Sequence, residues 1–117
     1  MMPTHLLPTE HDEQVAFVRW WRLRYPRVRI FAVPNGGLRT QRGGGRLKAE
    51  GASAGVPDLH VPAMGLWIEM KRREGGRLSQ AQRDWKQYLE SLGHDVIVAA
   101  GCSEAIKQVE HVMQRQV

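Results

Sequence analysis

Hydrophobic residues in the first part of the chain recur at helical spacing. Thr9 is a suitable N-cap and Pro26 interrupts the pattern, so we expect a helix from Glu10 to Tyr25. The residues that would form its buried face are Val15, Val18 and Trp21, with Phe17 and Trp20 beside them. This segment therefore predicts a helix packed on one side against a core.

The next segments favour a strand and then a loop. The run VRIFAV, residues 28–33, is β-branched and aromatic and predicts a strand that ends in the turn at 34–37. The basic, glycine-rich stretch 38–51, LRTQRGGGRLKAEG, follows it. We expect a mobile loop there, with one helical turn at 47–50.

A hairpin and a capped helix come next. Residues 58–62 and 66–71 predict two strands joined by a tight connection at 63–65. After a polar loop, SQAQ has the Ser-x-x-Gln form of a capping box, so a helix should run from Ser79 to near Gly93. Its expected apolar face consists of Trp85, Tyr88, Leu89 and Leu92.

The C-terminal part predicts one more strand and one more helix. The wholly apolar run VIVAA, residues 96–100, suits the middle of a sheet, and Ser103 is a suitable cap for the last helix. That helix carries Ile106, Val109, Val112 and Met113. The order helix, strand, hairpin, helix, strand, helix predicts an α/β fold with a mixed sheet flanked by helices.

The predicted hairpin carries charges that core strands normally lack. Successive side chains of a strand point to opposite faces, so Asp58 shares a face with His60, and Glu69 shares one with Trp67 and Lys71. If Ala63 and Met64 form a two-residue turn, the register that pairs the apolar residues also places Asp58 opposite Glu69. A slip of two residues would keep the faces but separate the acids. His60 has no second ligand at metal-binding spacing, and we expect a structural role for it.

Two carboxylates on neighbouring strands repel each other unless a positive group lies between them. The pair Asp58 and Glu69 could share a proton, pair with Lys71 or bind a metal ion. Mg²⁺ or Mn²⁺ takes oxygen ligands, and the backbone carbonyl of Met70 would complete a partial shell filled by water. Lys71 could then hold a water and oppose charge on a phosphate. A solvated strand face with a surface salt bridge is the alternative that the residues leave open.

Composition and net charge limit the kinds of partner that the protein is expected to bind. The 117 residues fit one domain, with 1–8 as a flexible N-terminus, and 17 Lys and Arg against 12 Asp and Glu give a net charge of +5. This excess favours nucleic acid over a membrane as partner. Cys102 is the only cysteine, which excludes an internal disulfide and fits a reducing compartment. Without a membrane span or signal peptide, we expect a cytoplasmic protein.

Several motifs together resemble a known family. The pair PD, followed after ten residues by EMK, is similar to the Pro-Asp…(Asp/Glu)-x-Lys motif of restriction-endonuclease-like nucleases. The longer series PNGG, LKAEGASAGVPD, GLWIEMKRREGGRLSQAQ and WKQYLESLGHDVIVAAG resembles the virus-type replication-repair nuclease (VRR-NUC) domain, in its stand-alone phage and bacterial form. The resemblance spans about residues 10–105. It implies a restriction-endonuclease-like αβββαβ core.

The resemblance also implies residue roles. It makes Asp58 and Glu69 metal ligands and Lys71 the catalytic lysine, and it turns Gln82 toward the site, where the same residue also completes the capping box. The family places a Glu of the N-terminal helix near the metal, where a water could bridge it. Of Glu10 and Glu13, the resemblance favours Glu10, four residues before Gln14, although either acid could be a solvated first-turn charge.

Basic residues flank this set in the sequence. The side chains expected to position DNA are Arg39, Arg42, Arg46 and Lys48, followed by Arg72 and Arg73. Glycines 43–45 would let their loop approach a phosphate backbone. Asn35 in PNGG could contact substrate, but Asn-Gly is also a common turn signal, which we favour. A solvated basic loop is the alternative for this segment.

These features lead to one functional hypothesis and two rivals. The resemblance implies a divalent-metal-dependent DNA endonuclease, similar to Holliday-junction resolvases, that acts on branched DNA as a homodimer. A flap-specific or 5′-end-specific nuclease is the rival within the same class. A basic module that binds DNA without cutting it is the rival from another class, and two acids facing a polyanion argue against it.

Overall fold

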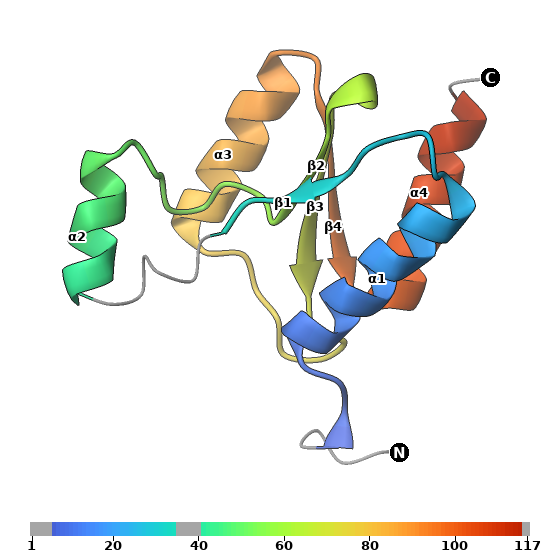
Figure 1. Ribbon diagram of the computed structural model, residues 1–117, viewed down its shortest axis with the longest axis horizontal. Coiled ribbons are helices and arrows are strands. Elements are labelled where there is room, and N and C mark those ends of the chain that lie inside the picture. Colours follow the sequence, from blue (N-terminus) through green and yellow to red (C-terminus); the bar gives the residue numbers. More distant parts are fainter. Residues whose placement is uncertain (1–5, 35–40, 116–117) are drawn as a thin grey trace.

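The computed structural model describes residues 6–34 and 41–115, and Figure 1 shows their arrangement. The elements in chain order are α1 (Glu10–Arg24), β1 (Phe31–Ala32), α2 (Gln41–Ala49), β2 (Leu59–Val61), the 3₁₀ turn η3 (Pro62–Met64), β3 (Leu66–Lys71), α3 (Gln80–Ser91), β4 (Asp95–Ala100) and α4 (Cys102–Arg115). The capping boxes expected at Thr9 and Ser79 are both present. Of the expected flexible N-terminus, residues 1–5 lie outside the described residues.

The strands form a four-stranded sheet in the order β1-β2-β3-β4. The first two pairings are antiparallel and the third, β3 with β4, is parallel. Alternate side chains of β2 and β3 point into a core made with α1 and α4, while α3 lies on the other side of the sheet (Figure 1). The predicted α/β fold with a mixed sheet flanked by helices is confirmed.

The register of the hairpin between β2 and β3 is the one that the apolar alternation predicts. Leu59 pairs with Ile68 and Val61 pairs with Leu66, and all four are fully buried. The connection is longer than the predicted two-residue turn, because η3 continues into Gly65, whose φ of 58° is in the left-handed region. There is no two-residue slip, so Asp58 lies at the level of Glu69.

The expectation of a loop at 38–51 is wrong for most of its length. Residues 41–49 form helix α2, and glycines 43–45 lie inside it. Each glycine costs a helix about 1 kcal/mol, but this stretch has no proline or β-branched residue, and good helix formers follow the glycines. The triple glycine is therefore not a loop that approaches a phosphate backbone.

Three smaller expectations also fail, at least in part. The strand expected at 28–33 is limited to Phe31–Ala32. The last helix begins at Cys102, so Ser103 lies inside its first turn rather than capping it, and the Glu104 carboxylate instead accepts a hydrogen bond from the Ala100 backbone N–H at 3.1 Å. The apolar faces are also incompletely covered, since Val15, Tyr88 and Leu92 are exposed.

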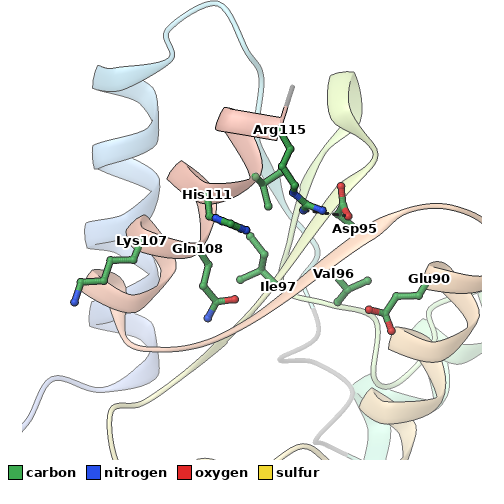
Figure 2. A pocket seen from close by; sticks show the side chains of 9 residues that line it. Glu90, Asp95, Val96, Ile97, Lys107, Gln108, His111 and Arg115 are labelled. Atoms are coloured by element: carbon green, nitrogen blue, oxygen red, sulfur yellow. Dashed lines mark ion pairs between the residues drawn. The ribbon is translucent and has the colours of Figure 1, made fainter. Parts of the chain in front are cut away.

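The outer edge of β4 is covered by side chains of α4. Gln108 donates hydrogen bonds to the Val98 carbonyl and to Glu104, both at 2.9 Å, and Figure 2 shows Gln108 between the helix and the strand. A cavity of about 430 Å³ beside it holds an ion pair between Arg115 and Asp95 at 3.7 Å. Paired charges and a covered edge make this region unsuited to extending the sheet. No helix among residues 6–34 and 41–115 is both long and apolar enough to cross a membrane.

Candidate active site

Asp58 and Glu69 meet where β2 begins and β3 approaches its end. The backbone carbonyl of Asp58 accepts a hydrogen bond from the N–H of Val33 at 2.8 Å, which ties it to β1. Its Oδ2 accepts from the backbone N–H of Met70 at 2.7 Å. The carbonyl of Lys71 accepts from Gly101 on the β4 side, so the backbone groups of the preceding Met70 face the other way, toward Asp58. The sheet thus brings Asp58, Glu69 and the Met70 backbone together, as the pairing predicts.

The carboxylate of Glu69 is buried and only half satisfied. It is 3% exposed; Oε1 accepts from the Gln82 amide at 2.6 Å and lies 3.7 Å from Lys71 Nζ. Oε2 has no hydrogen-bond partner among the described residues. Burial, then the nearby charge of Asp58, raise the pKa of Glu69 to about 8, against the opposing effect of Lys71. A buried oxygen without a partner and a carboxyl that resists ionisation both indicate a place for a cation.

The amide of Gln82 joins this site to the start of α3. Its Oε1 accepts hydrogen bonds from the Ser79 backbone N–H at 2.8 Å and from Lys71 Nζ at 3.0 Å, while Nε2 donates to Glu69. The Ser79 hydroxyl in turn accepts from the Gln82 backbone N–H. One residue therefore caps the helix and tethers two side chains of the site.

The two acids of α1 take different positions. Glu13 is 3% exposed, and its Oε2 pairs with Arg73 Nε at 2.9 Å while Oε1 accepts from the backbone N–H of Cys102 at 3.4 Å. Glu10 is exposed in the first turn, and its charge contributes to the raised pKa of Glu69. The charge of Glu10 thus reaches Glu69, whereas Glu13 is held by Arg73 and the Cys102 backbone.

The donor set suits a hard cation held by few protein groups. No cluster of three or more His, Cys, Asp or Glu able to hold a metal occurs in the described part of the chain. Two carboxylates, with Glu69 Oε2 unpartnered, supply the oxygen ligands that Mg²⁺ and Mn²⁺ prefer, and Mg²⁺ keeps several waters in its shell. The residues present therefore fit such an ion.

Comparison with known proteins decides the fold. No protein-family model matches the sequence, and no curated protein does. A solved structure described as "VRR_NUC domain protein" matches with a TM-score of 0.74 and 23% sequence identity, covering 89% of this chain and 87% of that one. The chain has the VRR-NUC fold.

On this VRR-NUC fold, the basic residues singled out in the sequence are scattered. Asn35 and Arg39 lie outside the described residues, and the side chain of Arg42 does too. Three others are exposed, Arg46 and Lys48 on α2 and Arg72 just after β3. Arg73 is half-exposed and holds Glu13, a structural role that the sequence did not reveal because 60 residues separate the partners.

The aromatic residues that gather beside the carboxylates were not predicted from the sequence. His60 stacks on Trp67 with ring centroids 3.7 Å apart, and Phe31 contacts His60 edge-on at 5.5 Å. His60 Nδ1 donates to the Leu66 carbonyl at 3.0 Å, and burial lowers the pKa of this imidazole. The structural role expected for His60 fits these contacts. The sequence does carry one signal for this group. Ile30 is buried and Phe31 is half-exposed, so the alternation of a strand places Phe31 on the face opposite the core.

Replacing Glu13 tests the division of roles within α1. Glu13→Gln keeps the shape but removes the charge that pairs with Arg73, so the free energy of unfolding should fall by about 1–3 kcal/mol. Chemical denaturation measures this change. Arg73→Ala should cost a similar amount, and the two losses should not add, since both remove one pair. Additive losses would contradict the pairing.

Proposed function

We propose that the protein is a divalent-metal-dependent, structure-selective DNA endonuclease that hydrolyses phosphodiester bonds. The observation that carries the proposal is the buried, half-satisfied Glu69 beside Asp58, with Lys71 at 3.7 Å, on a chain with the VRR-NUC fold. A strand pair that only binds DNA gains nothing from two carboxylates facing a polyanion. Acids that hold a cation remove that repulsion and give the phosphate a positive partner.

The residues that would hold Mg²⁺ or Mn²⁺ are Asp58 and Glu69, with the Met70 carbonyl beside them and Glu10 acting through a water. When bound, the ion supplies positive charge that polarises a phosphate oxygen and lowers the pKa of a coordinated water. Asp58 is already oriented by the Met70 N–H, and Glu69 by Gln82. The protein therefore presents both carboxylates in fixed positions.

Lys71 is the group of this chain that would touch the reacting atoms. Gln82 holds its ammonium at 3.0 Å, which restricts a long side chain to one position beside Glu69. From there Lys71 can orient the attacking water and oppose the negative charge that grows on the phosphate. Gln82 acts through Lys71 and Glu69, and is a positioning residue.

The exposed Arg46, Lys48 and Arg72 would contact the DNA backbone and set its position without reading its sequence. We propose branched DNA, as for Holliday-junction resolvases, with flap cutting as the rival. We further propose a cytoplasmic homodimer. The exposed apolar side of α1 offers a face for a second copy, since Val15 and Leu23 line a cavity of about 610 Å³ there. Molecular mass in solution tests the dimer.

A cleavage assay on four-way junction, flap and linear duplex DNA tests the activity. With Mg²⁺ or Mn²⁺ we expect cutting of the branched substrates, and none in EDTA. Lys71→Ala should lower the rate roughly 10²- to 10³-fold, the usual loss for one charge-stabilising group. Lys86→Ala is the matched control, because Lys86 is a lysine of α3 that pairs only with Glu90, at 3.0 Å, among the described residues.

Cleavage that survives EDTA, or an unchanged rate in Lys71→Ala, would rule out this mechanism. Tight binding of junction DNA without cutting would identify a binding module instead. A strong preference for flaps over junctions would favour the rival nuclease. Loss of activity in Lys86→Ala equal to that in Lys71→Ala would show that general surface charge, not position, matters.

A further inference from the structure

The sheet face that carries the acids also carries a row of aromatic rings, one step further along the strands. Phe31, His60 and Trp67 are register partners across β1, β2 and β3. Asp58 and Glu69 each lie two residues from this row on the same face. With a rise of about 3.3 Å per residue, the rings lie roughly 7 Å from the carboxylates along the strands.

Two of these rings are held in place by hydrogen bonds. His60 Nδ1 donates to the Leu66 carbonyl at 3.0 Å, and Trp67 Nε1 donates to His94 Nδ1 at 2.9 Å. The His60 and Trp67 rings are stacked at 3.7 Å with an interplanar angle of 21°. They form a rigid base for Phe31, which meets His60 edge-on at 89°. In this near-perpendicular arrangement, His60 covers at most one flat side of the Phe31 ring.

Phe31 is the exposed end of the row. Its side chain is 49% exposed, although its neighbour Ile30 is buried in the core on the opposite face. The helices α1 and α4 pack on that opposite face, so neither covers Phe31. A half-exposed ring with fixed support beside an acid site is a surface on which a planar group can stack.

We propose that Phe31 stacks an unpaired nucleobase of the DNA, next to the phosphate positioned at Asp58 and Glu69. The inference rests on the proposed nuclease function and specifies its substrate. Bases inside a duplex are stacked at 3.4 Å on both sides, so an aromatic side chain can stack only on a base at an end, a flap or a branch point. Selectivity for branched DNA then comes from the need for one unstacked base.

Binding to DNA that contains 2-aminopurine as the unpaired base at a branch tests this, with fully paired duplex as reference. In an Asp58→Asn background, in which we expect no cutting, Phe31→Ala should weaken binding of the branched DNA about 5- to 100-fold and abolish the fluorescence change that reports stacking. Binding of the duplex should not change. Phe31→Tyr should retain both signals. The matched control is Leu92→Ala at the C-terminal end of α3, a 57% exposed apolar residue ten positions along the chain from Gln82.

Several outcomes would overturn the inference. These are no binding of branched DNA, equal losses for branched and paired DNA, no loss in Phe31→Ala, or the same loss in Leu92→Ala. A change in molecular mass caused by Phe31→Ala would assign the ring to a contact between copies instead. Failure of the nuclease proposal is separate, because it requires that the unaltered protein cut no DNA with Mg²⁺ or Mn²⁺.

Discussion

Glu69→Gln is expected to abolish cleavage and, at the same time, to stabilise the protein at alkaline pH. Cleavage should fall roughly 10²- to 10³-fold or more, because one of the two carboxylates that would hold the metal is lost. Stability should not suffer, since glutamine has the same shape and buries no charge. A substitution that removes activity and raises stability is the signature of a residue kept for function.

The direction of the stability change follows from the raised pKa of Glu69. The folded protein raises the pKa of Glu69 from 4.5 to about 8, so between these values the folded state retains a proton that the unfolded state releases. The free energy of unfolding therefore falls as pH rises through this window, by at most about 1.4 kcal/mol per pH unit from this group. Glu69→Gln should remove that slope. Thermal unfolding at pH 5, 7 and 9 should show near-equal stability at pH 5 and a more stable variant at pH 9.

Glu13→Gln is the matched control, because Glu13 is equally buried but paired with Arg73. It should lose stability where Glu69→Gln gains it. Added Mg²⁺ should raise the midpoint of thermal unfolding of the unaltered protein and not that of Glu69→Gln, since only a binding-competent folded state is stabilised by ligand. Loss of stability in Glu69→Gln at pH 9, or an unchanged cleavage rate, would contradict the assignment of Glu69.

Local patterns predict the hairpin and the Gln82 cap because the forces there act between near neighbours. Apolar and polar residues alternate from Leu59 to Ile68, and a one-residue slip in the strand pairing would bury the charged side chains. The structure has the register that avoids this. Gln82 could be predicted as a cap from a spacing of three residues. The helix at 41–49 does not follow from its three glycines, which disfavour a helix; it forms because good helix formers stand beside them.

Contacts between distant segments could not be predicted from the sequence. Glu10 and Glu13 both lie in the first turn of α1. They differ because Arg73, 60 residues after Glu13 in the chain, forms an ion pair with Glu13. Phe31 reaches the carboxylate face because a strand of two residues pairs with β2. Each depends on packing that no short pattern encodes.

Gly55→Ala should damage both the fold and the site, because the loop before Asp58 passes very close to α3. A Cβ at Gly55 would lie 2.5 Å from the backbone carbon and oxygen of Ala81 and 2.8 Å from its Cβ, and Gly55 has a φ of 92°. Backbone atoms inside a helix cannot move aside as a flexible side chain can. The substitution must therefore push the loop away from the first turn of α3, which separates Asp58 from Gln82.

Gly93→Ala is the control that isolates this contact. Gly93 has nearly the same φ, 88°, but a Cβ there would meet no described atom within 4 Å. It should cost only the backbone strain, roughly 1–2 kcal/mol, whereas Gly55→Ala should cost about 1–3 kcal/mol more for the clash. Where both variants remain folded, only Gly55→Ala should lose cleavage, by about 10²-fold, because its catalytic groups are displaced.

Chemical denaturation and the junction assay measure both effects. Ala81→Gly added to Gly55→Ala should recover only part of the loss, because two of the three closest atoms belong to the backbone of residue 81. Full recovery would show that the side chain alone sets the spacing. Equal costs for Gly55→Ala and Gly93→Ala would mean that the loop and α3 do not meet there, and that the position of Asp58 relative to Gln82 does not depend on this contact.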